Sequence, residues 1–470
     1  MKKKSKLAFR GGSYSLVLTA IVLAILVVVN VLVSVLPSSL TKLDISSTKL
    51  YSITSNTKVV VNNLTKDVTI YWIVQADEED DVIENLLDKY DSLSDHIEVV
   101  KKNPDVYPTF AEQYTDETVA NNSLVVECGD RSRYIAYDDI YVQESDMYSY
   151  SYTTSFDGEG AITSAIDYVI SDELPKIYLL EGHGEQDLPD SFSEQITKEN
   201  YELESISLLK VDEIPEDASC LMIYAPQSDL SEEEVTMLSS YVSDGGKLLV
   251  MAGPVEDVEL TNLYGMLSKY GISAAEGIVV EADRDHYAFD RPYILLPDLA
   301  SSDVTDSLIE EKYYPILPLA TGLDVSAASS AVTPLLTTSA DSFSKVAGYA
   351  LDTYDKEDGD VDGAFALGVS ISDGDGQIIW YTSSTLMEDM YNAYSSGANI
   401  NLAMNSLSEL VGEREAIAIR SKSLNYNYLT ISDSQGSLLK TVMIALLPLA
   451  YLGIGIFIYM YTRRKQNEAA

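Results

Sequence analysis

The sequence predicts a mixed α/β protein held between two membrane-spanning helices. Two observations predict the helices, because uncharged apolar runs occupy residues 14–36 and 441–461 of the 470-residue chain. A third observation predicts the fold between them, where short apolar runs rich in β-branched residues alternate with segments of helical periodicity. Such alternation is typical of parallel strands joined by helices, and therefore of a doubly wound sheet.

The two apolar runs are long enough to cross a bilayer. Residues 14–36 number 23, of which sixteen are Leu, Ile or Val, and a helix of this length covers about 34 Å. Residues 441–461 contain Pro448 and two glycines, which membrane helices tolerate. The first run is longer than the apolar core of a signal peptide, and no small-residue cleavage site follows it. We therefore expect an anchor rather than a cleaved leader.

Basic residues flank both runs on their terminal sides. They are Lys2, Lys3, Lys4, Lys6 and Arg10 before the first run, and Arg463, Arg464 and Lys465 after the second. By the positive-inside rule, both termini are predicted to be cytoplasmic and residues 37–440 to face outward. The predicted location is the cell (plasma) membrane, with the lipid bilayer as a partner.

The segment between the runs is strongly acidic. Residues 1–36 and 439–470 hold nine of the 31 basic residues and one of the 74 acidic ones, which leaves 22 basic against 73 acidic residues. Such a surface repels phosphate backbones, so nucleic acid is excluded as a partner. Because apolar periodicity continues throughout, the acidity indicates charged faces on a folded domain rather than disorder.

Apolar periodicity predicts two α/β units in the first half of this segment. The first has a strand at 68–74, a helix at 82–93, a strand at 97–100 and a hairpin at 124–128 and 133–137. A helix at 160–171 leads to the second, with strands at 176–180, 221–224 and 248–251. Further on, a glycine-rich turn predicts a hairpin of 365–371 with 377–381, and apolar spacing over 400–410 predicts a last helix.

One helix of the second unit has clear start and stop signals. Ser231 is the predicted N-cap, and Glu234 stands three residues later as its capping-box partner. The pair Gly245-Gly246 ends the helix.

The motif Gly182-His183-Gly184-Glu185 follows a predicted strand, where open α/β sheets place ligands. His183, Glu185 and Asp187 are therefore candidates for metal ligands or an acid/base pair. The alternative is a glycine-rich turn that packs against the next helix. The chain has three histidines in separate segments, so a multi-histidine metal site is not expected.

Other motifs of catalysis are missing from the sequence. It contains no G-x-S-x-G nucleophile elbow and no P-loop, so we expect no catalytic residue, cofactor or ATP hydrolysis in this chain.

The acids Asp358, Asp360 and Asp362 match the first half of a calcium loop, but Val369 stands where such loops end in a bidentate acid. A weak calcium site and a solvated acidic turn both stay open.

Cys128 and Cys220 lie far apart and show no C-x-x-C spacing. Two free thiols are the simpler interpretation, and a single disulfide is the alternative.

Several short motifs, in chain order, resemble those of the gliding-motility-type ABC transporter auxiliary subunits, the GldG family. They lie at Leu43–Thr54, Asp67–Tyr71, Gly182–Glu185, Asp244–Val250, Asn399–Gly412 and Ala416–Lys422. The first is similar to the family pattern D-x-T-x-x-K-x-Y-S-L-S and the last to I-x-I-R-P-K. Glu409 and Ser421 depart from the family, which has Trp and Pro there.

The resemblance implies a thioredoxin-like α/β domain at 41–150 without redox cysteines, and a Rossmann-like domain at 157–425. The second domain would be akin to amidotransferase folds but non-catalytic. With cytoplasmic tails at 1–13 and 462–470, these complete the predicted organisation. The resemblance also implies an ABC permease and a cytoplasmic ATPase as partners of a non-catalytic auxiliary subunit. Alternatives from the residues alone are an extracellular protein that binds a glycan or peptide, and a surface hydrolase.

Overall fold

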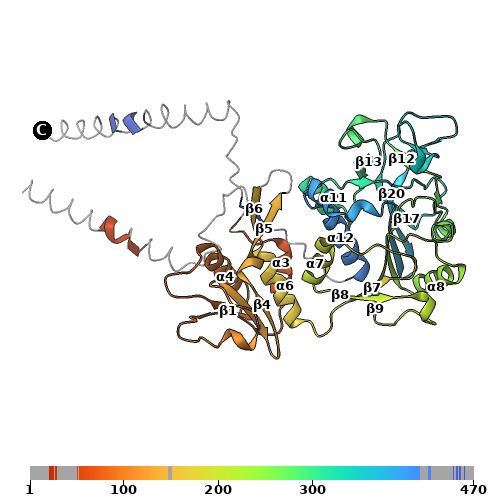
Figure 1. Cartoon of the computed structure of the whole chain (residues 1–470). Helices are drawn as coiled ribbons and strands as arrows, with labels where there is room; N and C mark the ends of the chain where they lie inside the picture. The colour runs from red at the N-terminus through yellow and green to blue at the C-terminus, as the bar shows by residue number, and fades with distance from the viewer. Residues whose placement is uncertain are drawn as a thin grey trace, which may run out of the picture.

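The computed structural model describes residues 52–146, 151–412 and 422–424, with residue 50 and scattered helical positions within 21–28 and 448–460. The predicted spans at 14–36 and 441–461, with both tails, lie mostly or wholly outside the described residues. No helix within the described part is both long and apolar enough to cross a membrane. The expected mixed α/β architecture is confirmed, as two units built on separate sheets (Figure 1).

A four-stranded sheet forms the first unit, in the order β2-β1-β3-β4. Its elements are α3 (Ser55–Asn62), β1 (Val68–Ile73), α4 (Asp81–Leu93), β2 (Ile97–Lys102), β3 (Ser123–Cys128), β4 (Arg131–Ile135), α5 (Tyr137–Ile140) and α6 (Gly158–Ile170). β1 pairs in parallel with β2, whereas β3 runs antiparallel to β1 and β4. The predicted β-α-β unit and hairpin are therefore confirmed.

Helix α4 shows how the local sequence builds this unit. The Asp80 carboxylate accepts hydrogen bonds from the backbone N–H groups of Val82 and Ile83, at 2.8 and 3.0 Å, and so caps the helix. Four residues later, Leu87 lies on the same face as Ile83, and both are buried with Tyr90 against the sheet. Burying each side chain contributes about 1.5–3 kcal/mol.

A small sheet of order β22-β6-β5 joins distant parts of the chain. β5 (Tyr141–Asp146) and β6 (Ser151–Phe156) form a hairpin, and β22 (Lys422–Ser423) adds to β6 from the far end of the described chain. None of these three strands was predicted from the sequence.

The second unit has a ten-stranded sheet, one side of which is parallel. Its main elements are β7 (Lys176–Leu180), α7 (Asp190–Lys198), β8 (Glu202–Ile206), β9 (Ala218–Tyr224), α8 (Glu232–Ser243), β10 (Lys247–Met251), β20 (Ala366–Asp373), β21 (Gly376–Tyr381) and α12 (Ala398–Val411). Five strands run parallel in the order β8-β7-β9-β10-β21, and β20 then pairs antiparallel with β21.

Short elements fill the region between β10 and β20 and surround the sheet. The helices are α9 (Thr261–Gly265), α10 (Asp306–Glu311) and α11 (Asp389–Tyr394). The strands are β11 (Ser273–Ala274), β12 (Ile278–Val280), β13 (Ile294–Leu295), β14 (Asp298–Leu299), β15 (Leu317–Pro318), β16 (Leu323–Asp324), β17 (Val332–Thr337), β18 (Phe343–Lys345) and β19 (Val361–Asp362).

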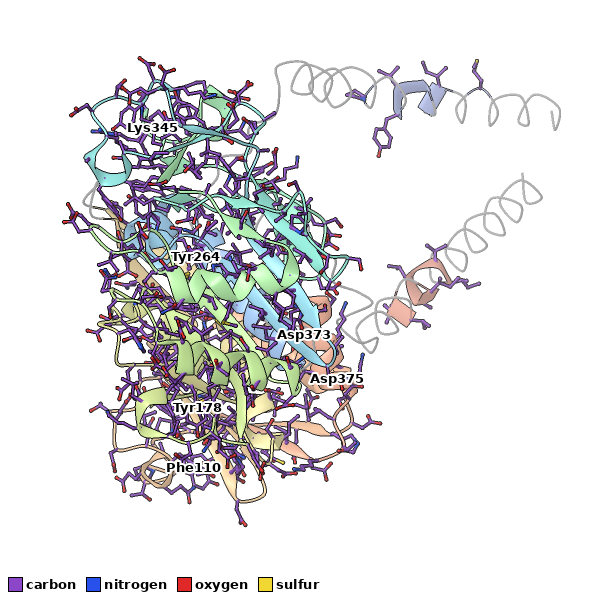
Figure 2. The ribbon with its side chains drawn as sticks, turned by 90° about the vertical axis from the view of Figure 1, so that its right-hand side faces the viewer. Phe110, Tyr178, Tyr264, Lys345, Asp373 and Asp375 are labelled. Carbon is purple, nitrogen blue, oxygen red and sulfur yellow. The ribbon has the colours of Figure 1, made fainter. Side chains whose placement is uncertain are left out.

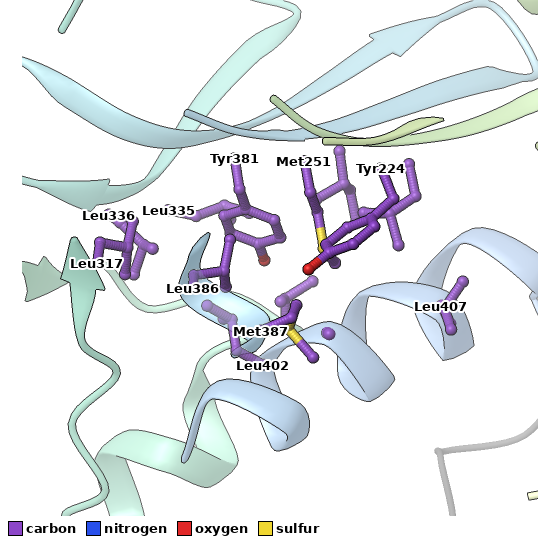
Figure 3. Close-up of a cluster of buried hydrophobic side chains, with 14 of the residues drawn as sticks. Tyr224, Met251, Leu317, Leu335, Leu336, Tyr381, Leu386, Met387, Leu402 and Leu407 are labelled. Carbon is purple, nitrogen blue, oxygen red and sulfur yellow. The ribbon is translucent and has the colours of Figure 1, made fainter. Parts of the chain in front are cut away.

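Alternation along the strands divides the core of the second unit into two layers. In β9, Met222 and Tyr224 belong to the cluster under α7 and α12, whereas Leu221 and Ile223 belong to the cluster under α8. Figure 3 shows Tyr224, Met251 and Tyr381 on the sheet side, opposite the α12 residues Leu402 and Leu407. Helices therefore cover both faces, as the alternating pattern predicts.

Polar side chains connect the two units. Asn200, which has a left-handed backbone (φ 64°), donates from its amide to the Ser164 carbonyl at 2.9 Å. Arg133 donates to both Ser164 and Asn200, and Lys198 forms an ion pair with the buried Asp157. The units thus meet through directed hydrogen bonds between α6 and the end of α7.

At this junction the structure predicts a pH dependence centred on Glu199. Burial, reinforced by the negative charges of Asp157 and Asp167, raises the pKa of Glu199 to about 8. The unfolded carboxyl releases its proton near pH 4.3. The free energy of unfolding therefore falls as the pH rises from about 4 to about 8.

Glu199→Gln is expected to flatten this pH profile, as measured by urea unfolding of the detergent-solubilised chain between about pH 5 and pH 8. Glu202→Gln, at an exposed neighbour, is the matched control and should leave the slope unchanged. If Glu199→Gln loses stability with pH as steeply as the wild type, the assignment to Glu199 is wrong.

Candidate functional site

The turn that follows β7 is tightly held by its own side chains. Gly182 and Gly184 have φ values of 126° and 71°, which favour glycine. The Glu185 carboxylate at the end of the turn accepts hydrogen bonds from the backbone N–H groups of Gly182 at 3.0 Å and His183 at 2.8 Å. The two glycines in the motif are thus required by the backbone of the turn.

His183 lies between two carboxylates and is 5% exposed. Its Nδ1 is 3.1 Å from Glu185 Oε1, and its Nε2 is 3.1 Å from Glu234 Oε2. Glu234 also completes the predicted capping box of α8, by accepting from the N–H of Ser231 at 2.9 Å. The predicted start of α8 is therefore confirmed. Through its contact with Glu234, His183 connects the turn after β7 to the first turn of this helix.

Hydrogen bonds from its neighbours set the pKa of Glu234 in this cluster. Burial alone would raise the pKa of Glu234, but hydrogen bonds from Ser231 and from His183 outweigh it and hold the pKa below its ordinary value. Both ring nitrogens of His183 are engaged by carboxylates, so neither nitrogen is free for a substrate or metal.

The predicted trio of His183, Glu185 and Asp187 is only partly brought together. His183 and Glu185 are in contact, but no hydrogen bond joins Asp187 to them in the described part of the chain. Sequence reasoning missed Glu234 as the second partner of His183, because it lies 51 positions further along. Within the described residues, no group of three or more His, Cys, Asp or Glu is arranged to hold a metal ion.

The strained backbone after β9 carries no nucleophile. Ala225 has φ 49° and is fully buried, and its N–H donates to the Met251 carbonyl at 2.9 Å. Hydrolases place a Ser or Cys on such a strained turn between strand and helix. The methyl group of Ala225 cannot attack a substrate.

Both cysteines are free. Cys220 is buried in β9, and burial raises the pKa of its thiol to about 12, so it stays protonated and unreactive. Cys128 is half-buried at the end of β3.

A lysine occupies the calcium-like loop. Lys345 Nζ lies 3.3 Å from Asp360 and 2.5 Å from Glu357, and the Lys345 side chain is fully buried. Asp360 also accepts from the N–H groups of Val346 and Glu357, and Asp362 pairs with Lys356. Two of the three candidate carboxylates, Asp360 and Asp362, therefore hold the loop, whereas Asp358 is exposed.

Calcium is expected to leave the melting temperature of the full chain unchanged, because a cation at Asp360 would compete with the Lys345 ammonium. Magnesium at the same concentration is the control for ionic strength. A saturable rise with calcium that Asp360→Asn removes would contradict this.

A second buried charge lies where both ends of the described chain meet. The Glu159 carboxylate, in the first turn of α6, is 2% exposed. Its Oε1 accepts from Thr54 N at 2.6 Å and from the Thr57 hydroxyl at 2.7 Å, and its Oε2 accepts from Lys422 Nζ at 2.9 Å. Lys422 also donates to the Ser52 carbonyl at 2.7 Å. We name these five residues the clasp.

The clasp joins two segments that are distant in sequence. Ser52 and Thr54 follow the predicted first span, and Lys422 precedes the second. β22 supports this contact, because Leu424 N donates to the Thr154 carbonyl at 2.9 Å. The motifs at Leu43–Thr54 and Ala416–Lys422 were recognised in the sequence, but their shared partner Glu159 was not. A signal for Glu159 was its place in the first turn of a helix that is mostly apolar.

The arrangement defines an α/β protein with a closed, structural histidine and no nucleophile at its strained turn. Residues 174–372 match the family model described as an ABC-type uncharacterized transport system, and residues 47–143 match a domain of unknown function (DUF7088). The predicted resemblance to ABC transporter auxiliary proteins is confirmed at this level. Membership of the GldG family itself stays a prediction. A comparison with curated proteins gives no match.

Solved structures are similar to about half of the chain at low identity. The mmIFT52 N-terminal domain has a TM-score of 0.38 at 16% identity, and covers 50% of this chain and 97% of its own. A cytoplasmic protein from Salmonella typhimurium LT2 has a TM-score of 0.30 at 12% identity, covering 50% and 99%. A glutamine amidotransferase from Thermotoga maritima has a TM-score of 0.30 at 9% identity, covering 51% and 99%.

Proposed function

We propose that this chain is a non-catalytic auxiliary subunit of an ABC-type transport system, acting with a permease and a cytoplasmic ATPase. The observation that carries the proposal is the match of residues 174–372 to a transport-system family. The order of GldG-type motifs along the chain supports the finer assignment to that family. The geometry of the β7 and β9 turns supports a role without chemistry, since His183 is occupied and Ala225 stands at the strained position.

The proposal extends to membrane attachment. Helices at 14–36 and 441–461 would anchor the chain in the cell membrane, with both termini cytoplasmic and residues 37–440 outside. A reporter that fluoresces only in the cytoplasm should be active when fused after residue 470. Loss of that fluorescence, with activity of an externally active reporter at the same position, would overturn this orientation.

The first unit would be a thioredoxin-like domain adapted to binding. A parallel β-α-β unit followed by an antiparallel hairpin and α6 supports this assignment. The single cysteine of the unit, Cys128, is free and cannot form the dithiol of a redox enzyme on its own.

The clasp gives the auxiliary role a physical basis. Because Thr54 and Lys422 bind the same Glu159 carboxylate, the segments next to both spans are tied to one helix. A relative movement of the spans would strain these hydrogen bonds, and the strain would act on Glu159 in the first turn of α6. The ectodomain would thus follow the state of a transporter in which the spans are embedded.

Affinity purification of the tagged full-length chain in mild detergent, followed by mass spectrometry, tests the association. A permease and an ATPase recovered in a fixed ratio are expected. A homo-oligomer that stays free of both after cross-linking in cells would overturn the proposal and favour a ligand-binding surface protein.

A further inference from the structure

A cavity of about 440 Å³ lies in the first unit, at the carboxyl ends of β1 and β2. The loop 103–122 forms most of its wall. Its principal lining residues are Gln75, Lys102, Tyr107, Phe110, Glu112 and Glu117. Figure 2 places Phe110 near one end of the molecule, far from Lys345 in the second unit. The volume of the cavity is within the range of binding sites for small ligands and short peptide segments.

Aromatic rings hold a lysine ammonium at this cavity. Lys102 Nζ lies 5.0 Å from the ring centre of Phe110, 5.3 Å from that of Tyr71 and 5.4 Å from that of Tyr107. Within the described residues, no carboxylate forms an ion pair with Lys102. Rings attract a cation but do not neutralise it, so Lys102 presents a positive charge in a cavity whose wall also carries Glu112 and Glu117.

The preceding residue shows the contrast. Lys101 points to the opposite face of β2, as alternate strand residues do. Its Nζ pairs with Glu84 at 2.8 Å and Glu79 at 3.5 Å, and lies over the ring of Trp72. One of the two neighbouring lysines thus has its charge compensated by the fold, and the other does not.

β2 is also an edge strand of its sheet. It pairs with β1 and with no other strand of the described chain. Its outer edge therefore offers backbone N–H and C=O groups to an added extended chain, which would reach the cavity at Lys102.

The cavity wall is pre-formed and its mouth is partly apolar. Gln75 N donates to Asn121 Oδ1 at 2.9 Å, and the Asn121 amide donates back to Gln75 Oε1 at 3.0 Å. Tyr107 is 54% exposed and Val106 is 64% exposed. The exposed ring of Tyr107, which lines the cavity, is therefore accessible to an incoming ligand.

We propose that this cavity binds the carboxyl-terminal end of an extended peptide. The terminal carboxylate binds the Lys102 ammonium, and an apolar side chain packs against Tyr107 and Phe110. Glu112 and Glu117 are exposed on the same wall, where they accept hydrogen bonds from N–H groups of the peptide. The proposal is independent of the transport role.

Isothermal titration calorimetry of the detergent-solubilised full chain tests this with acetyl-Ala-Ala-Phe as the free acid and as its terminal amide. The free acid is expected to bind at least about tenfold more tightly than the amide, because only the acid forms an ion pair with the Lys102 ammonium. Equal affinities, or no binding of the acid at millimolar concentration, would overturn the proposal.

Two variants separate the cation from the apolar contact. Lys102→Gln should remove the preference for the acid, whereas Lys101→Gln, the matched control on the other face of β2, should retain it. Tyr107→Ala should weaken both peptides without removing the preference, and circular dichroism checks that each variant is folded. A Lys102→Gln protein that discriminates acid from amide like the wild type would contradict the assigned site.

Discussion

Replacing Lys422 with Met is expected to lower the free energy of unfolding of the first unit by about 3 kcal/mol, because Glu159 would keep a buried charge without its ammonium partner. Glu159 is 2% and the Lys422 side chain 11% exposed, so little water can take the place of the lost ammonium. The loss would be measured by urea unfolding of the full chain, in a Trp380→Phe background where Trp72 reports on the first unit.

The matched control is Lys66→Met, which breaks an exposed ion pair with Asp172. Its cost should stay below about 1 kcal/mol. Adding Glu159→Gln to Lys422→Met should recover part of the loss, since the buried charge is then removed as well. Equal losses from Lys422→Met and Lys66→Met would show that the clasp does not hold the two segments.

The second large effect is expected at His183. His183→Ala should lower the free energy of unfolding of the second unit by about 3 kcal/mol, because it leaves the buried carboxylates of Glu185 and Glu234 without their shared partner. Fluorescence of Trp380, in a Trp72→Phe background, follows this unit during urea unfolding.

His96→Ala provides the control for a histidine ion pair on the surface. His96 contacts Asp67 at 2.7 Å, but the Asp67 side chain is 91% exposed, so the cost should be below about 1 kcal/mol. If His183→Ala is as stable as His96→Ala, then His183 is not the structural link described here, and its role as a binding residue has to be reconsidered.

Local signals explain which elements the sequence could predict. The Ser231 and Glu234 capping box, the β-α-β unit and the hairpin around residue 374 all depend on residues within a few turns of one another. For the same reason the strand at 176–180 matches β7 residue for residue.

Non-local pairing explains what the sequence could not predict. β21 was predicted only as half of a hairpin, but it also pairs with β10, more than 100 residues earlier, and so extends the parallel sheet. In the candidate sites, too, contacts between residues close in sequence were predicted and contacts between distant residues were not. His183 and Glu185 are neighbours, whereas the contacts of Glu159 with Thr54 and Lys422 span 105 and 263 positions. No periodicity or spacing indicates such partners.

The acidic loop at 358–363 was misleading for a related reason. Three alternating aspartates resemble the start of a calcium site, but Lys345 of β18 already supplies an ammonium to the middle one, Asp360, and to Glu357. The local motif shows the three aspartates, but it does not show that the Lys345 ammonium lies next to Asp360 in the folded chain.

We propose that this chain serves an ABC transporter without chemistry of its own. The most direct measurement is ATP hydrolysis by the co-purified complex in lipid nanodiscs, with the wild-type chain and with the Lys422→Met variant. We predict that the wild-type chain changes the rate and that Lys422→Met, while still bound, loses the effect. A hydrolysis rate that is the same with and without this chain would contradict the account.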